Sequence, residues 1–444
     1  MNGHTKFRVN PIDASFLRLD SPKTRQIIAT VWLVDGSPSI DVIRARMLSA
    51  VSRFRRLKCR VVEERGILWW EQDPGFSIDR HFCALSYCAS IDGDLEMSIS
   101  KVLSLGFPSD RPPWQLVVIS PDSEGCAGDP KNPSAVMIYG HHAFADGISG
   151  IELHRSLADR SDLPCDDASV FLGHNTQSAS TYHVPSLAFD SVFSLATLKH
   201  LKKELFAKRA ASCLNGENST QRAVRFVDLP LRDLKLIKQK LRVGVHEILL
   251  SLIAGAVEQY GTNNDDHSVV PRDRGHLRVL VPINLRASDE RCELGNHLTG
   301  ACLDIPLQSL NTLERTLHIQ RTISRMQKDG SFSVYGAIGK LLFKLPTFMQ
   351  TKLYCAQAEK TNLICSAIPG SRKIERVNGL PILSHYGMPV PMSGHGLAVG
   401  FLTYSQKVCL CLHYDPILLP DPSAFQNSIE REMTQLFELA MAGG

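Results

Sequence analysis

Long hydrophobic segments are absent from this chain of 444 residues. The longest uncharged apolar run, at 248–257, is far shorter than the roughly 18 to 20 residues that a membrane-spanning helix needs. The N-terminal stretch carries His4, Lys6 and Arg8 and no apolar core, so it is not a signal peptide. These absences predict a cytoplasmic protein with no membrane-spanning helix and leave peripheral contact with a membrane open.

The chain also lacks a large net charge and any cysteine spacing typical of a metal site or a redox pair. The formal net charge of +4 is nearly balanced for this length and gives no reason to expect nucleic acid as a partner. The twelve cysteines include no C-x-x-C pair and no Cys/His cluster with zinc spacing. We therefore expect buried, reduced thiols, no metal site and no redox cofactor.

What the chain does contain is a succession of strand and helix patterns. In the first half, hydrophobic periodicity predicts strands at 27–34, 59–62, 67–71, 114–120 and 135–139, and helices at 40–54 and 148–158. In the second half it predicts a buried helix at 245–260, strands at 277–283 and 301–305, a hairpin of 397–403 with 408–413, and a final helix after Asp421. This mixture predicts an α/β (α+β) fold.

Two segments leave alternatives open. The basic amphipathic stretch 195–209 is typical of a solvated helix face, or of a patch that binds lipid or phosphate. The apolar stretch 334–354, interrupted by lysines and Pro346, favours core helices broken at proline, with a lipid-facing or tunnel-lining surface as the alternative.

We divide the chain into a first lobe at 1–185, a linker at 186–221 and a second lobe at 222–444.

The most unusual motif is YGHHAFADGISG at 139–150, which follows a buried strand and precedes a helix. Adjacent residues at a strand end point to opposite sides, so one metal ion would not readily bind both His141 and His142. The histidines could instead be structural groups. Alternatively, one of them is a general base, because a neutral imidazole accepts a proton near physiological pH. The other would then anchor the loop.

The remaining residues of the motif fit a base. Asp146 is well placed to pair with a distant arginine and fix the loop. Gly147 leaves room for a substrate or supplies an unusual backbone conformation. The chain has no G-x-S-x-G, so it lacks the turn that a serine nucleophile would need.

These residues resemble a known family. The pattern H-H-x-x-x-D-G is similar to the signature of chloramphenicol acetyltransferase-like acyltransferases and condensation domains. Further blocks resemble the wax ester synthase/diacylglycerol acyltransferase family, in the same order and over nearly the whole chain. They are PIDASFLRLDS (11–21), SDRPPWQLVVI (109–119), VPINLR (281–286), LGN (294–296) and SAIPGS (366–371).

The resemblance implies two chloramphenicol acetyltransferase-like lobes, each a mixed sheet flanked by helices, with a tunnel between them. It implies His142 as general base, His141 and Gly147 as structural parts of the motif, and an ion pair between Asp146 and Arg286 across the lobes. Ser366 would donate to the developing oxyanion, and Asn284 would support the site. Substrate-binding residues would be Trp114, His246, Glu247 and Asn296.

Two departures from the family pattern affect the expected acceptor. His246-Glu247 stands where an Asn-Asp pair is usual, and Ser366-Ala367 stands where Ser-Asn is usual. These departures weaken the expectation of a standard triglyceride or wax ester role and favour, as a further possibility, a specialised acceptor such as a polyketide or terpenoid hydroxyl. The D-F-G-W-G signature of condensation domains is absent, which argues against peptide synthesis on carrier proteins.

The resemblance thus predicts an O-acyltransferase that moves an acyl group from acyl-CoA, its co-substrate, to a hydroxyl of a lipid alcohol, diacylglycerol or specialised metabolite, without a cofactor. We expect a monomer, because the two halves could bury each other's interface. One alternative is a condensation-like enzyme that uses a carrier-bound or metabolite acyl donor. Another is a non-catalytic binding protein with a tunnel.

Overall fold

A computed structural model describes residues 6–88, 94–122, 132–159, 202, 204, 206–209, 212–263, 275–285, 294–307, 310–342 and 344–442. The first half contains β1 (Lys6–Arg8), α1 (Pro11–Leu19), β2 (Ile27–Val34), α2 (Ile40–Arg53), η1 (Arg55–Lys58), β3 (Cys59–Glu64), β4 (Ile67–Gln72), η2 (Ile78–Arg80), β5 (Phe82–Tyr87), α3 (Leu95–Leu103), β6 (Trp114–Pro121), β7 (Ser134–His141) and α4 (Gly147–Arg155).

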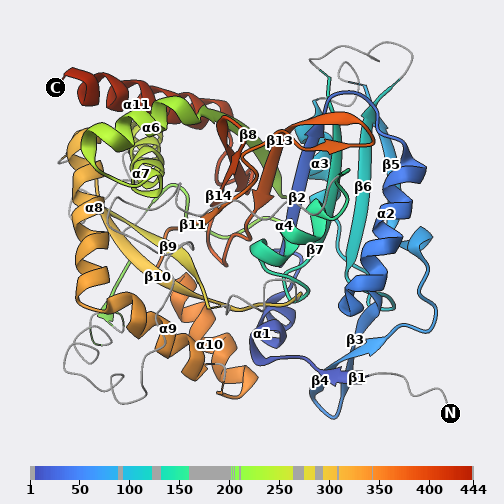
Figure 1. Cartoon of the computed structure of the whole chain (residues 1–444). Coiled ribbons are helices and arrows are strands. Elements are labelled where there is room, and N and C mark those ends of the chain that lie inside the picture. The colour runs from blue at the N-terminus through green and yellow to red at the C-terminus, as the bar shows by residue number, and fades with distance from the viewer. Residues whose placement is uncertain are drawn as a thin grey trace.

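The second half begins with β8 (Ala223–Pro230) and ends with α11 (Pro422–Ala442). Between them lie α6 (Leu231–Leu241), α7 (Val245–Asn263), β9 (His276–Asn284), β10 (Leu298–Pro306), α8 (Thr312–Lys328), α9 (Ser331–Leu342), α10 (Thr347–Ala358), β11 (Leu363–Ile368), β12 (Arg376–Val377), β13 (Leu380–Met388), β14 (Leu397–Tyr404) and β15 (Lys407–Tyr414). In Figure 1 the second half lies on the left and most of the first half on the right.

Each half is built around a six-stranded mixed sheet. The first sheet has the order β12-β13-β2-β7-β6-β5, with only β5 and β6 parallel. The second has the order β10-β9-β11-β14-β15-β8, in which β11 runs parallel to both neighbours. A smaller antiparallel sheet joins β1, β4 and β3. The α/β architecture predicted from the sequence is confirmed.

Strands β12 and β13 belong to the first sheet although they come late in the chain. Met388 of β13 pairs with Ala29 of β2, and the ladder runs on to Val34. The first sheet therefore depends on residues 376–388, which a division of the chain at 221 assigns to the second lobe. The lobe boundaries at 185 and 221 themselves stay predictions.

The second sheet is buried on both faces, because its strands alternate between two cores. In β15, Val408, Leu410 and Leu412 pack in the core that includes residues of α7 and α11. Cys409 and Cys411 point the other way, into the core of the first half. Such a strand has no polar face, which is why β15 reads as a continuous apolar run.

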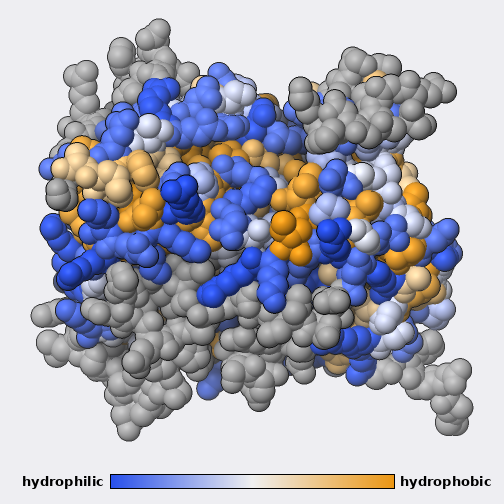
Figure 2. Space-filling model, turned by 45° about the horizontal axis from the view of Figure 1, so that its top comes forward, coloured by the Kyte–Doolittle hydropathy of each residue, from blue (hydrophilic) through white to orange (hydrophobic). Residues whose placement is uncertain are grey.

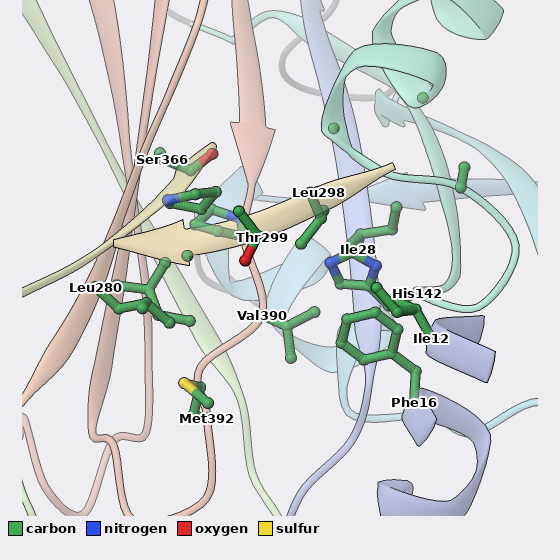
Figure 3. Close-up of a pocket in the computed structure, with 18 of the residues that line it drawn as sticks. Ile12, Phe16, Ile28, His142, Leu280, Leu298, Thr299, Ser366, Val390 and Met392 are labelled. Atoms are coloured by element: carbon green, nitrogen blue, oxygen red, sulfur yellow. The ribbon is translucent and has the colours of Figure 1, made fainter. Parts of the chain in front are cut away.

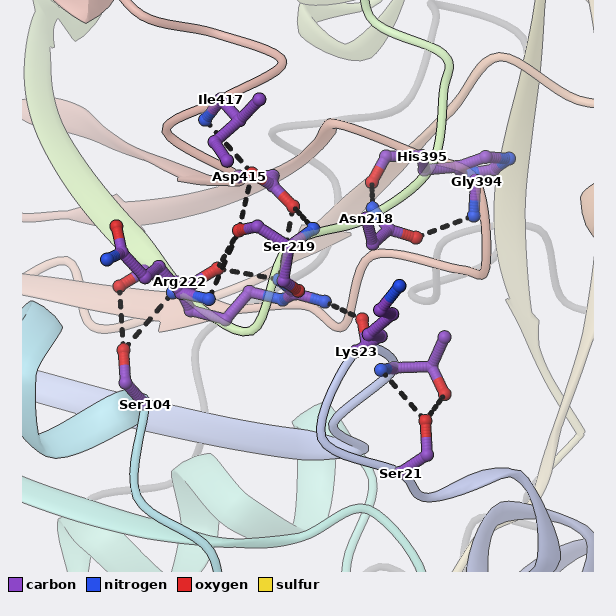
Figure 4. A network of polar contacts seen from close by, with 12 residues as sticks. Ser21, Lys23, Ser104, Asn218, Ser219, Arg222, Gly394, His395, Asp415 and Ile417 are labelled. Atoms are coloured by element: carbon purple, nitrogen blue, oxygen red, sulfur yellow. Dashed lines mark hydrogen bonds and ion pairs between the residues drawn. The ribbon is translucent and has the colours of Figure 1, made fainter.

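A polar network also ties the two halves together (Figure 4). The buried guanidinium of Arg222 donates to the backbone carbonyl of Lys23 and forms an ion pair of 3.4 Å with Asp415. Ser104 accepts a hydrogen bond of 3.2 Å from the Arg222 backbone. The Asp415 carboxylate also accepts from the backbone and hydroxyl of Ser219, at 2.6 and 2.9 Å. Loops distant in sequence are thereby held at one junction.

The predicted elements agree with the structure at most positions. The stretch 334–354 forms α9 and α10, separated near Pro346, so helices broken at proline are confirmed. Asp421 accepts a hydrogen bond from the Ala424 backbone at 2.8 Å and begins α11 as expected. The nine cysteines that the structure describes are all free. Most of the basic stretch 195–209 lies outside the described residues.

The surface carries hydrophobic side chains in patches. On the face shown in Figure 2 they gather in several places, with hydrophilic side chains between them. None of the helices in the described part of the chain combines the length and the hydropathy that crossing a membrane requires.

Candidate active site

A cavity of about 410 Å³ lies between the two halves, and its wall is mainly apolar (Figure 3). Phe16 and Ile28 reach it from the first half, and Leu280 and Met392 reach it from the second. Four residues that the sequence singled out also line it: Trp114, His142, Gly147 and Ser366. The tunnel-lining interpretation of 334–354 holds in part, because side chains of α9 and α10 close one side of the cavity.

His142 stands at the end of β7, where the strand gives way to the loop. Its backbone N–H donates to the carbonyl of Gln26 at 2.6 Å, so the start of β2 fixes the position of the residue. The imidazole stacks on the ring of Phe16, with centroids 4.1 Å apart and planes 9° from parallel. Nδ1 has no hydrogen-bond partner among the described residues and is buried. Because a substrate cannot reach a buried atom, Nε2 is the ring nitrogen left to accept a proton.

The surroundings of His142 favour the neutral imidazole. Burial lowers the pKa of His142 from its ordinary value of 6.5. Its own backbone carbonyl, the carboxylate of Asp146 and the side chain of Asn296 oppose this shift and are outweighed. A neutral ring is the form that can accept a proton from a bound hydroxyl.

His141 points away from the cavity into the protein. Its side chain is buried, and Nδ1 accepts a hydrogen bond of 3.1 Å from the backbone of Ala143. Nε2 lies 3.8 Å from a carboxylate oxygen of Asp20. Burial lowers the pKa of His141 to about 4, although Asp20 favours the charged form. The two histidines thus face opposite sides, as their position at a strand end predicted.

Asp146 caps α4 and joins the loop to the second half. Its carboxylate accepts from the backbone and hydroxyl of Ser149, both at 3.0 Å, in a capping box. The other carboxylate oxygen accepts from the backbone of His297 at 3.3 Å, and the Asp146 backbone donates to Gly295 at 3.2 Å. The predicted partner, Arg286, lies outside the described residues.

Gly147 lies close to the tip of a side chain from the second half. A Cβ at this position would lie 2.4 Å from Cδ1 of Ile368 in β11. Its φ is not in the left-handed region, so an unusual backbone is not the reason for glycine. Ser366, two residues before Ile368, also lines the cavity, and its backbone pairs with Gly400 of β14.

The predicted substrate-binding residues have different surroundings. Trp114 is buried, lines the cavity and donates from Nε1 to the carbonyl of Leu57 at 2.9 Å. Asn296 is buried outside the cavity wall and donates to the carbonyl of His142 at 2.6 Å. Asn284 ends β9, where its backbone pairs with Leu298.

His246 and Glu247 lie near the start of α7, and neither lines the cavity. Both are buried, and His246 makes an edge contact with Phe401, which does line it. Burial lowers the pKa of His246 to about 4 and raises that of Glu247 to about 7. Their placement argues against direct contact with a substrate in this cavity.

Polar groups in the cavity wall are few. Glu204, Gln357 and Lys360 contribute side chains, and Arg278 pairs with Glu204 and, at 2.6 Å, with Asp304. Among the residues that the structure describes, no three His, Cys, Asp or Glu side chains come together in a group that could hold a metal ion.

Comparison with known proteins identifies the family. Residues 9–248 match the wax ester synthase/diacylglycerol acyltransferase catalytic domain, and residues 294–437 match the C-terminal domain of the same family. The chain belongs to the wax ester synthase/diacylglycerol acyltransferase family. Two relatives from Mycobacterium tuberculosis carry diacylglycerol O-acyltransferase names. One is 25% identical over 455 residues, covering 97% of this chain and 95% of that protein. The other is 22% identical over 474 residues, covering 97% and 96%.

Solved structures show the same two-lobed, chloramphenicol acetyltransferase-like fold. The wax ester synthase/diacylglycerol acyltransferase from Marinobacter aquaeolei VT8 matches with a TM-score of 0.68 and 17% identity, covering 98% of this chain and 99% of that one. A mutant starter condensation domain of rhizomide synthetase, in complex with C8-CoA and Leu-SNAC, matches with a TM-score of 0.61 and 12% identity, covering 98% and 95%. This protein is therefore an acyltransferase with the predicted fold.

Sequence reasoning missed several residues around the acyltransferase motif. Phe16 stacks on His142, Arg56 donates to the carbonyl of Ala143 in the loop, and Asp13 accepts hydrogen bonds from both Arg56 and Asn296. Asp13 and Phe16 fall within a block that carried the family resemblance, but an acidic residue in an amphipathic helix normally signals a solvated face. Periodicity alone could not reveal that this carboxylate is buried.

Proposed function

We propose that this protein transfers an acyl group from acyl-CoA to the hydroxyl of an alcohol, with His142 as the general base. The observation that carries the proposal is the position of His142. Its ring reaches a mainly apolar cavity between the lobes, and burial favours its neutral form. Burial against such an apolar wall stabilises a bound acyl chain by about 0.8 kcal/mol for each CH₂ group.

The reaction needs a base that accepts the hydroxyl proton and hydrogen-bond donors that stabilise the oxyanion. Nε2 of His142 takes the hydroxyl proton as the alcohol oxygen forms a bond to the thioester carbonyl carbon. The carbonyl oxygen becomes an oxyanion, which the Ser366 hydroxyl can stabilise from the cavity wall. The C–S bond then breaks, the ester is released, and the leaving coenzyme A thiolate receives from His142 the proton that the alcohol gave up.

The acceptor is a lipid alcohol, diacylglycerol or a specialised metabolite with a hydroxyl group. The apolar wall suits all three. The polar side chains of Glu204, Gln357 and Lys360 in the wall favour an acceptor that carries a further polar group. A carrier-bound acyl donor is the second candidate, because condensation domains share the fold.

The test is product formation by the purified protein. Incubation with acyl-CoA of increasing chain length and with hexadecanol, dioleoylglycerol or a terpenoid alcohol should release free thiol and ester in equal amounts. Because the pKa of His142 is lowered, the rate should fall on the acidic side only below about pH 6.5. Thiol release with no ester would indicate hydrolysis, and neither product with any acyl-CoA would contradict the proposal.

We further propose that the mouth of the cavity contacts a lipid surface. Four large apolar side chains on α9 and α10 are exposed: Leu341 by 52%, Phe348 by 64%, Met349 by 39% and Leu353 by 42%. Leu353 also lines the cavity. The exposed Lys344 and Lys352 lie among them, and cations beside an apolar patch favour anionic lipids. An alcohol substrate could then enter directly from the lipid.

A vesicle experiment tests this contact. The double variant L341S/F348S should bind vesicles of phosphatidylglycerol at least about tenfold more weakly than the wild type, because burying each side chain contributes about 1.5–3 kcal/mol. The control is I417S, which removes a side chain of similar exposure, 68%, from the loop before α11. Equal losses in both variants, or no binding by the wild type, would count against this surface.

A further inference from the structure

A buried carboxylate lies behind the loop that carries His142. Asp13 of α1 is fully buried, and its backbone N–H donates to the side chain of Asn10 at 2.7 Å. One carboxylate oxygen accepts from Arg56 at 2.8 Å, and the other accepts from the Asn296 amide at 2.8 Å. Removal of either partner would leave a buried charge incompletely paired, which is costly.

Both partners of Asp13 also bind the loop itself. The Arg56 guanidinium donates to the carbonyl of Ala143 at 3.2 Å and lies 3.4 Å from that of Phe144. The Asn296 amide donates to the carbonyl of His142 at 2.6 Å. Three successive carbonyls are therefore held by two side chains, and Asp13 fixes both of those side chains.

The three residues come from distant parts of the chain. Asp13 is on α1, Arg56 is in η1, and Asn296 precedes β10 in the second half. None of them lines the cavity. Phe16, three residues after Asp13 and hence on the same face of α1, stacks on the imidazole. Helix α1 thus contacts the ring of His142 directly through Phe16 and reaches its backbone carbonyl only through Asn296.

We propose that Asp13, Arg56 and Asn296 form a clamp of positioning residues that sets the orientation of His142 for proton transfer. This inference rests on the proposed function, because it assigns the clamp to the same base. The clamp acts on the loop carbonyls and makes no contact with substrate. Its loss should therefore lower kcat and leave substrate binding unchanged, since misplacement of a reacting group by about 1 Å can cost on the order of 100-fold in rate.

The variants R56K and N296A test the clamp. Each should lower kcat roughly 10- to 100-fold, while the KM values for acyl-CoA and alcohol stay within about twofold of the wild type. The matched control is R315K. Arg315 is also a buried guanidinium that pairs with carboxylates, at 3.3 Å to Glu432, and contacts a backbone carbonyl, at 3.3 Å to Ser251, but it lies away from the cavity. R315K should reduce the Tm and leave kcat unchanged.

A swapped pair separates orientation from stability. In D13N/N296D the amide and carboxylate exchange places, so a hydrogen bond between positions 13 and 296 can form again and the Tm should recover relative to N296D. A carboxylate at position 296 cannot donate to the His142 carbonyl, so kcat should stay low. Recovery of kcat together with the Tm would overturn the clamp, as would losses of kcat in R56K and N296A that R315K reproduces.

Hydrogen exchange provides a readout that does not depend on turnover. Peptides that cover 142–146 should exchange faster in R56K and N296A and at the wild-type rate in R315K. Unchanged exchange in these peptides would overturn the clamp even if the substrates were wrongly assigned. A wild-type protein that forms no ester would contradict the proposed function alone.

Discussion

Replacement of His142 by Ala is expected to lower kcat by about 10²- to 10⁴-fold, the usual contribution of a positioned general base. The variant loses the one imidazole that lines the cavity among the described residues. KM values should change little, because the apolar wall that holds an acyl chain remains. The measurement is the steady-state release of coenzyme A thiol with a saturating alcohol. H142Q, which keeps a polar side chain of similar length but no base, should be equally impaired.

The control for loss of a histidine is H318A, because His318 is exposed on α8 and lies away from the cavity. It should turn over at the wild-type rate. A wild-type rate in H142A would mean that another group removes the proton, and family membership would then have to be reconciled with a different base.

Replacement of Gly400 by Ala is expected to destabilise the fold by about 1–3 kcal/mol or more. A Cβ at position 400 would lie 2.0 Å from the backbone oxygen of Gly387 and 3.0 Å from Cδ of Pro389. Gly400 belongs to the second sheet and Gly387 to the first, so the clash falls where the two sheets meet, beside the cavity. A backbone obstacle cannot rotate away, and β13 and β14 must separate. The free energy of unfolding in urea measures the effect.

Gly150→Ala is the matched control. Gly150 lies inside α4, has no heavy atom within 4 Å of its ideal Cβ position, and is not in the left-handed region. Alanine favours a helix over glycine by about 1 kcal/mol, so G150A should be as stable as the wild type or more so. A G400A protein as stable as G150A would show that the sheets can move apart without cost.

The sequence was informative where the local pattern and the tertiary structure agree. The strand at 27–34 was predicted with the bounds that β2 has, because nearly all its side chains are apolar and most are buried. The strand end and the opposite directions of adjacent side chains predicted that only one of the two histidines faces a cavity, and the family resemblance indicated that it is His142, which lines the cavity. The resemblance to the family supplied the fold, which periodicity could not.

What the sequence could not reveal depends on contacts between distant residues. Asn296 was assigned to the substrate, yet its amide is occupied by Asp13 and the His142 carbonyl. A Cβ at position 147 would meet the end of the Ile368 side chain, which lies more than two hundred residues later in the chain. Neither contact has a local signal, since each arises only when the second half packs against the first.

The late arrival of β13 has a consequence for protein synthesis. While the ribosome makes the first half, β2 has β7 on one side only, because its other neighbour is encoded at 380–388. An unpaired strand edge invites association with other chains. The nascent chain therefore carries this exposed edge through most of translation, and the first half can complete its folding only after almost the entire protein has been synthesised.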